Sequence, residues 1–285
     1  MKSSISPKLC KLCESHDVFI VLTLSELNLY FCRTCGHYQL LDEIKESEND
    51  LNLPVLGPWD LIKHFRNLAA RVTSDFNPEL NGLIVDIGNN GEALLQYFQG
   101  LGLRVLGINS EKDTAIHAIY NGIPTLTEHF NLETAKNLKQ EYGLATIITV
   151  NYLFNRINNI KEIILGIKEL LAEDGILIIE VPYFKEILSK RLLGAINRSQ
   201  IHQHTVWPFH LFLKKYDLTI FKLEAINTYE GSIRLYVKKT NYQRDDSGAV
   251  IEAPISSDVI NFTKIESELG LFNPTSEKSI IGKLK

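Results

Sequence analysis

All four cysteines of the chain fall into two C-x-x-C pairs near its N-terminus. Cys10 and Cys13 form the first pair, Cys32 and Cys35 form the second, and eighteen residues separate the pairs. Each pair directs two sulfur atoms toward one point, so two pairs provide the four ligands of a tetrahedral zinc ion. The spacing predicts a structural zinc site, which joins chain segments and leaves no open coordination position for catalysis.

Two disulfides or a redox pair are the alternative interpretations of this pattern. No apolar signal segment precedes the cysteines, and chains that stay in the cytoplasm rarely keep disulfides. A thioredoxin-type redox pair would not occur twice. His16 and His37 lie close enough in the sequence to replace one sulfur, but four thiolates complete a zinc site without them. We therefore expect zinc and a cytoplasmic location.

Charge and hydropathy restrict the class of partner. The 285-residue chain has a net charge of -4, whereas nucleic-acid binding needs a basic face. Its longest apolar stretches have the length of strands, so no transmembrane helix is expected. The chain is therefore expected to bind neither nucleic acid nor a membrane, and its expected partner is a small molecule.

The order of the expected elements predicts four regions. These are a zinc-binding module over residues 1–50, a helical linker over 51–80, an α/β domain over 81–240 and a C-terminal tail over 241–285. Short strands are expected over residues 19–24, 27–31 and 37–41, a loop over 43–52, a helix from Pro58 to before Pro78, and a weak helical stretch over 259–269.

Strands and helices alternate within residues 81–240, which predicts a mostly parallel sheet covered by helices on both faces. Expected strands cover 83–87, 103–108, 145–150, 175–181, 218–226 and 232–239, and expected helices cover 91–99, 132–142, 161–172 and 209–215, with a short helix from Tyr183. Ser110 is expected to cap a helix ending at Tyr120. The last two strands are expected to form an antiparallel hairpin, and the segment before residue 205 a polar loop.

The first strand of this alternation runs directly into a glycine-containing turn. Gly88 and Gly91 permit a tight turn and close approach of a ligand to the backbone, and the following helix offers free N–H groups. The missing third glycine argues against a dinucleotide. Asp86 suits S-adenosylmethionine, because its carboxylate can meet the cationic amino-acid end of that cofactor. A tight turn without any ligand is the alternative.

Two further polar residues follow strands at the same edge of the sheet. Asn109 ends the second strand, where an acidic residue usually accepts both ribose hydroxyls, and Asn151 ends the strand over 145–150. Ligands of open α/β folds bind at the carboxyl edge of the sheet. Both residues are therefore candidates for cofactor binding, together with Asn89 in the turn.

The chain resembles the zinc-containing sugar C-methyltransferases, which are S-adenosylmethionine enzymes of deoxysugar biosynthesis. The resemblance covers roughly residues 8–240. It rests on the two cysteine pairs and on the ordered segments LIVDIGNNG, GIPTLTEHF, VNYLFNRINNI, ILIIEVPYF, IHQH and EGSIRLYV. It implies a class I methyltransferase-like, Rossmann-type α/β fold with a mostly parallel seven-stranded sheet. It also implies methylation of a carbon next to the ketone of a sugar or nucleotide-sugar.

The resemblance also implies roles for residues beyond the cofactor turn. His204 matches the family's base, which removes the proton next to the ketone. His202 precedes it by two residues and is a further catalytic candidate, and Tyr183 and His210 are the next candidates for the base. The acceptor-binding residues implied are Gln203, Ser232 and Arg234. Exposed loop histidines without a catalytic role are the alternative for His202 and His204.

The chain departs from the family pattern at several positions. Ile201 and Gln203 stand where the family has Tyr and Glu, Asn109 stands where it has Asp, and the turn at Asn89 and Asn90 is one residue shorter. A methyltransferase-like binding protein without turnover is therefore an alternative, and an RNA methyltransferase is disfavoured by the acidic charge. Members of the family continue into another α/β domain that helps to hold the nucleotide-sugar, so a second chain could supply this part.

Overall fold

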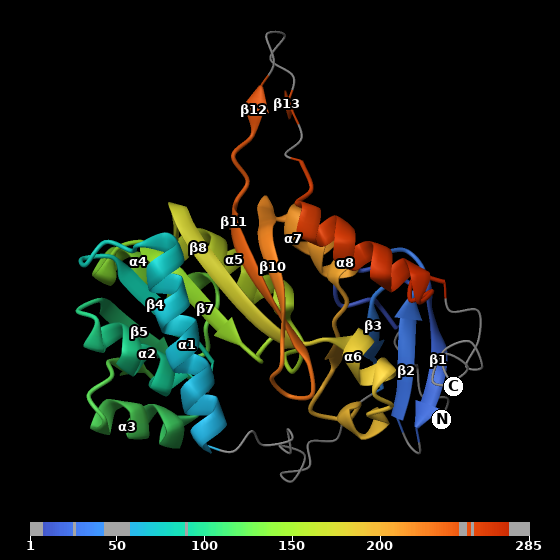
Figure 1. Ribbon diagram of the computed structural model, residues 1–285, viewed down its shortest axis with the longest axis horizontal. Coiled ribbons are helices and arrows are strands. Elements are labelled where there is room, and N and C mark those ends of the chain that lie inside the picture. Colours follow the sequence, from blue (N-terminus) through green and yellow to red (C-terminus); the bar gives the residue numbers. More distant parts are fainter. Residues whose placement is uncertain are drawn as a thin grey trace, which may run out of the picture.

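The computed structural model describes residues 8–24, 27–42, 58–88, 91–244, 250–251 and 254–273. A seven-stranded sheet forms the centre of the molecule (Figure 1). Its strands, in spatial order, are β10 (Leu218–Ile226), β11 (Ser232–Lys239), β8 (Leu171–Pro182), β7 (Ala145–Asn151), β4 (Leu83–Ile87), β5 (Arg104–Ile108) and β6 (Thr125–Leu126). Strand β11 runs antiparallel to both of its neighbours, and the other pairings are parallel. The predicted α/β fold with a mostly parallel sheet and a terminal hairpin is confirmed.

Helices cover both faces of this sheet because its central strands are apolar on both sides. On one face, α1 (Pro58–Phe76), α2 (Gly91–Gly100) and α3 (Lys112–Tyr120) pack through a core that includes Phe65 and Phe98. On the other face lie α4 (Leu132–Tyr142), α5 (Ile160–Leu170) and α7 (Val206–Lys215), with Ile164 and Phe209 in their core. The two helical layers leave the carboxyl ends of the parallel strands as the polar edge.

A second, four-stranded sheet lies next to the cysteine pairs. It consists of β1 (Val18–Leu24), β2 (Leu27–Cys32), β3 (Tyr38–Leu40) and β9 (His202–Gln203), in this order. Strand β9 comes from the segment that was predicted to be a polar loop, and that prediction is wrong for residues 202–203. Strand β9 pairs antiparallel with β3, so that Tyr38 lies opposite Gln203 and Gln39 lies opposite His202. The segment before it also contains α6 (Phe184–Ser189) and the short 3-10 helix η1 (Leu193–Ala195).

The C-terminal part of the chain adds to the main body. Helix α8 (Ser257–Glu268), expected as a weak helical stretch, packs against α7 and β10. The tyrosine hydroxyl of Tyr38 donates to the carbonyl of Leu271 at 2.6 Å, which ties the segment after α8 to the smaller sheet. Strands β12 (Gln243–Arg244) and β13 (Val250–Ile251) pair beyond β11 (Figure 1). In the part of the chain that the structure describes, no helix is both long and apolar enough to span a bilayer.

Two local predictions differ from the structure, and one strand was not predicted. Ser110 does not cap α3, because Glu111 occupies the N-cap position. The helix predicted over 161–172 ends at Leu170, since β8 already begins at Leu171. The two-residue strand β6 was not predicted, because two residues carry no periodic pattern. The loop expected over 43–52 lies outside the described residues.

Candidate functional site

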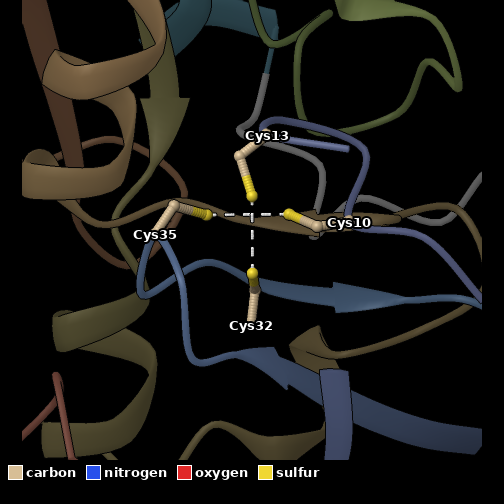
Figure 2. Close-up of side chains that lie close together, drawn as sticks. All are labelled: Cys10, Cys13, Cys32 and Cys35. Atoms are coloured by element: carbon tan, nitrogen blue, oxygen red, sulfur yellow. Dashed lines mark hydrogen bonds between the residues drawn. The ribbon is translucent and has the colours of Figure 1, made fainter. Parts of the chain in front are cut away.

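The four cysteines converge on one point between β1, β2 and the N-terminal turn (Figure 2). Their sulfur atoms all lie within 4.8 Å of one another, with 3.6 Å between the Sγ atoms of Cys10 and Cys35 and 3.5 Å between those of Cys13 and Cys32. Zinc–sulfur bonds of about 2.3 Å place the corners of a tetrahedron roughly 3.8 Å apart. All four cysteines are free thiols, so this structure contains no disulfide among them. The donor set therefore fits zinc.

Both cysteine pairs adopt the same backbone turn. The N–H of Glu14 donates to the carbonyl of Cys10 at 2.8 Å, and the N–H of Gly36 donates to the carbonyl of Cys32 at 2.8 Å. Glu14 and Gly36 each follow the second cysteine of a pair, and their φ angles are 64° and 82°. Two turns with the same hydrogen bond and the same left-handed residue are typical of a preformed metal knuckle rather than of a redox pair.

Asp86 lies at the carboxyl end of β4 as a buried carboxyl group. It accepts hydrogen bonds from the Thr149 hydroxyl and from Asn151 Nδ2, the latter at 3.2 Å. Burial raises the pKa of Asp86 to about 7, the two hydrogen bonds oppose this shift, and the nearby charge of Glu180 adds to it. The oxygen of the Asn151 amide is buried and has no hydrogen-bond partner among the described residues. A cationic ligand group at this edge would find an acceptor in both side chains.

Gly88 and Asn109 border a small cavity beside Asp86. Gly88 has a φ angle of 121°, where a residue with a Cβ is strained. The cavity holds about 20 Å³, and its lining also includes Glu92 and Thr114. Gly91 begins α2 next to it, whereas Asn89 lies outside the described residues. The predicted cofactor residues that the structure describes are therefore brought together at one edge.

The side-chain amide of Asn109 already makes one hydrogen bond within its own turn. Its Oδ1 accepts the backbone N–H of Glu111 at 2.8 Å, and the side chain is nearly buried. Asn109 also lines the cavity that Gly88 borders. One carboxylate in this lining was not predicted: Glu92, in the first turn of α2, which accepts from His117 and Asn121 at 2.7 Å each.

The histidines predicted for catalysis lie inside the protein. His202 and His204 are 1% and 0% exposed, which excludes the alternative of exposed loop histidines. The Nε2 atom of His204 lies 3.1 Å from the Phe154 carbonyl, and that of His202 lies 3.0 Å from the Ile157 carbonyl. Burial lowers the pKa of His204 to about 4. The His202 ring stacks on the His37 ring and the His204 ring lies tilted beside it, and His37 shares a hydrogen bond of 2.9 Å with His202 Nδ1.

Tyr183 and the predicted acceptor-binding residues are also buried and already paired. The Tyr183 hydroxyl donates to Glu266 of α8 at 3.0 Å. The Gln203 amide donates to the Gln200 carbonyl at 2.9 Å, and the Ser232 hydroxyl donates to the Thr228 carbonyl at 2.8 Å. His210, the further candidate for the base, is buried on α7. In this arrangement these side chains serve internal contacts.

Arg234 belongs to a charged group that the sequence did not predict. Its Nε atom lies 2.6 Å from Glu180 Oε1, and His64 Nε2 lies 2.7 Å from Glu180 Oε2. His64 comes from α1, within the region predicted to be only a helical linker. The motif E-V-P-Y contained Glu180, but a single histidine on a helix carries no local signal that would connect the two residues.

The arrangement of strands decides the fold comparison. Numbered along the chain, the seven strands of a class I methyltransferase lie in the spatial order 3-2-1-4-5-7-6, and only the seventh strand is antiparallel. The strands β6-β5-β4-β7-β8-β11-β10 have this order here. The chain has the class I methyltransferase fold. A solved structure of the PH0226 protein from Pyrococcus horikoshii OT3 matches it with a TM-score of 0.50 and 11% identity, over 62% of this chain and 90% of that one.

Other comparisons are more distant or partial. The magnesium protoporphyrin IX methyltransferase ChlM from Synechocystis PCC 6803 matches with a TM-score of 0.48 and 16% identity, over 63% of this chain and 83% of that one. No protein-family model matches the chain. The C-methyltransferase NovU from Streptomyces niveus is 24% identical over 232 residues, which are 81% of this chain and 55% of NovU. The chain thus spans about half the length of this curated relative.

Proposed function

We propose that the protein is an S-adenosylmethionine-dependent C-methyltransferase that acts on a sugar or nucleotide-sugar carbon next to a ketone. The observation that carries this proposal is the buried carboxyl group of Asp86 beside the left-handed turn at Gly88, at the carboxyl edge of the sheet. The likeness to NovU, which is named a C-methyltransferase, supports methylation of carbon. The resemblance in the order of motifs supports the sugar acceptor.

The residues at this edge suit each part of the cofactor. Asp86 and the unpaired Asn151 oxygen would meet the cationic amino-acid end, since both accept hydrogen bonds. Asn109 would contact the ribose, and the turn from Gly88 would allow the close approach that a Cβ prevents. The cofactor supplies an electrophilic methyl carbon on a sulfonium. The protein must then hold the acceptor carbon in line with it and remove one proton.

We also propose that the cysteine cluster holds one structural zinc ion. All four positions of a tetrahedral ion would be filled by sulfur, so the metal would stabilise the fold of the smaller sheet and take no part in methyl transfer. This assignment is independent of the acceptor.

Calorimetric titration with S-adenosylmethionine and S-adenosylhomocysteine tests the proposed function. We expect micromolar binding by the wild-type protein and none by Gly88→Val, because valine is strained at a φ angle of 121° and fills the approach to the backbone. Gly122→Val is the matched control: Gly122 also has a positive φ angle, at 81°, but its Cβ would meet only open space. Wild-type protein that binds neither ligand contradicts the proposal.

A binding protein without turnover is the second candidate. The observation that favours it is the burial of His202 and His204, together with amides at Asn109 and Gln203 where the family has acids. Such a protein would bind S-adenosylhomocysteine but would transfer no methyl group to any ketosugar. Transfer of a radiolabelled methyl group to an acceptor would therefore eliminate it.

A further inference from the structure

A histidine and a buried glutamate form a hydrogen-bonded pair at the edge where the cofactor residues lie. His64 Nε2 is 2.7 Å from Glu180 Oε2, and the other oxygen of Glu180 accepts from Arg234 Nε at 2.6 Å. The Glu180 side chain is fully buried, whereas that of His64 is 11% exposed. The other ring nitrogen of His64, Nδ1, takes no part in this pair. The pair therefore has a buried carboxylate at one end and, at the other, the His64 Nδ1 atom, which does not contact Glu180.

This arrangement fixes the tautomer of the imidazole. A carboxylate only accepts, so neutral His64 places its proton on Nε2 and keeps a lone pair on Nδ1. Burial alone would disfavour the charge of Glu180, but the hydrogen bond from His64 and the charge of Arg234 hold its pKa below the usual range. Glu180 therefore stays ionised and can stabilise the imidazolium that forms when Nδ1 takes a proton, as the acid of a catalytic triad does.

The pair lies two strands away from Asp86, with β7 between β4 and β8. Asn151 stands opposite Glu180 in the register of β7 and β8, and its amide donates to Asp86 at 3.2 Å. Figure 1 shows α1 crossing the sheet with its first turns at the end where the parallel strands terminate. His64, in the second turn of α1, therefore meets Glu180 from the helical layer at the edge of the sheet where Asp86 and Asn151 lie.

Two residues with strained backbone conformations lie beside the pair. Tyr152, directly after Asn151, has a φ angle of 55°, and its N–H donates to the Glu180 carbonyl at 2.8 Å. Its ring contacts Tyr229 with 4.2 Å between centroids, and Tyr229 also has a positive φ angle, 47°. Left-handed conformations of residues other than glycine cost free energy and cluster at functional sites. This strain is an observation independent of the hydrogen bonds.

We propose that His64 is the general base of the methyl transfer and that Glu180 is its positioning residue. The inference rests on the proposed function. His204, the base implied by the resemblance, is 0% exposed and its Nε2 lies at a backbone carbonyl, whereas the His64 side chain is 11% exposed.

The proposed reaction begins with the removal of a proton and ends with a new carbon–carbon bond. Nδ1 of His64 takes the proton from the carbon next to the ketone, and the electrons of the broken C–H bond form an enolate on the acceptor. The enolate carbon then forms a bond to the methyl carbon of S-adenosylmethionine, and the electrons of the broken C–S bond remain on sulfur as a thioether. The ketone is restored, and the proton on His64 passes to solvent.

Exchange of the acidic carbon proton tests the base without methyl transfer. Wild-type protein, saturated with S-adenosylhomocysteine, is incubated in D₂O with a panel of nucleoside-diphosphate-linked ketosugars, and deuterium incorporation is followed by NMR. We expect exchange by the wild type and a loss of about 10²–10⁴-fold in His64→Gln, which keeps an N–H for Glu180 but has no basic nitrogen. The matched control is His16→Gln, an exposed histidine before β1 in the N-terminal turn.

A pH profile separates positioning from structural support. In Glu180→Gln the imidazolium loses its anionic partner, so the midpoint of the exchange rate should move to lower pH, whereas a purely structural role would lower the rate without moving the midpoint. S-adenosylhomocysteine affinity should stay within about twofold of wild type in His64→Gln.

Three results would overturn the assignment of the base. The first is full exchange by His64→Gln. The second is loss of exchange in His204→Gln while His64→Gln exchanges as wild type does. The third is no exchange of any ketosugar by wild-type protein that binds S-adenosylhomocysteine. Wild-type protein that fails to bind S-adenosylhomocysteine at all overturns the proposed function instead, so the two failures are distinguishable.

Discussion

Asp86 is a carboxyl group whose charge depends on what lies beside it. Burial raises its pKa to about 7, so near neutral pH a large share of the free protein carries a protonated Asp86. A cationic ligand group favours the ionised form and would release that proton on binding. The residue therefore couples cofactor binding to pH.

Affinity for S-adenosylmethionine should rise with pH. Below about pH 7 the protonated form predominates, so we expect affinity to fall up to about tenfold per pH unit as the pH decreases toward 5. Calorimetry between pH 5.5 and 8.5 measures this dependence, and two buffers of different ionisation enthalpy report the released proton. Asp86→Asn should bind weakly and with little dependence on pH, and a flat wild-type profile would exclude this role.

Asn109→Asp should tighten cofactor binding. The new carboxylate can still accept from Glu111 N, as the amide oxygen does at 2.8 Å, and its second oxygen can accept from a ribose hydroxyl. A hydrogen bond to a charged group contributes about 1.5–3 kcal/mol, so roughly tenfold tighter binding is expected. Titration with S-adenosylhomocysteine checks this, and Asp113→Asn in α3 is a control of opposite charge change. Weaker binding by Asn109→Asp would place the ribose elsewhere.

At the scale of elements, the two cysteine turns and helix α8 hold segments that lack a large core of their own. The cysteine turns join the N-terminal turn to β2, and α8 reaches back to α7. Glu266 of α8 accepts from the backbone N–H groups of Val206 at 2.6 Å and Trp207 at 3.3 Å. A carboxylate from a distant helix thus caps α7, whose own N-cap residue Thr205 makes no side-chain cap.

Removal of metal should loosen the smaller sheet first. We expect about one zinc per chain in protein prepared without added metal, and faster hydrogen exchange within residues 8–41 after chelation, because metal binding contributes to folding there. Mass spectrometry and elemental analysis measure these quantities. The Cys10→Ser/Cys32→Ser variant should lose the metal, while His16→Ala should keep it. Metal retained by the double variant would contradict a four-cysteine site.

Glu266 should make the protein less stable as the pH rises. Burial raises its pKa to about 7, although the hydrogen bonds from Val206, Tyr183 and Trp207 oppose this. The folded state therefore binds a proton that the unfolded state releases above about pH 4.5, and stability falls between pH 4.5 and 7 by up to about 3 kcal/mol. Urea unfolding at pH 5 and 8 should show a smaller decrease in Glu266→Gln, while the exposed-site variant Glu268→Gln should behave as wild type. Equal decreases in all three proteins would rule out Glu266 as the cause.

At the scale of the whole molecule, the buried histidines have the opposite effect to Glu266, because they make the protein less stable as the pH falls. Burial lowers the pKa of His204 to about 4, so the unfolded state binds a proton below about pH 6.5 that the folded state binds only near pH 4. Stability is therefore lost as the pH falls from 6.5 to 4, and together with Glu266 this predicts a maximum on the acidic side of neutrality.

Acid unfolding followed by circular dichroism measures the contribution of His204. His204→Gln should keep a polar group opposite the Phe154 carbonyl and should lose less stability between pH 6.5 and 4 than wild type does. The control is His129→Gln, a substitution of an exposed histidine. An unchanged acid transition in His204→Gln would show that other groups govern it.

The sequence contains the local features of this molecule but not its long-range pairings. Apolar periodicity predicts β4, β7 and α5, and the glycines predict the turn before α2, because these signals lie within one element. Strand β9 forms only because β3 offers an edge to it, and Glu266 caps a helix about sixty residues before it in the chain. His64 and Glu180 meet across 116 positions, so no pattern of spacing could have joined them.

The placement of β9 has a consequence for the ancestry of such chains. A crossover between two related genes that exchanged only the cysteine-bearing segment would transfer β1, β2 and β3 but would leave their fourth strand, His202–Gln203, with the other parent. The two pieces would then have to match where Tyr38 pairs with Gln203 and Gln39 pairs with His202, without having been selected together. We expect functional hybrids to be those that inherit both stretches from one parent, so that the segments are transmitted as a unit despite their distance along the gene.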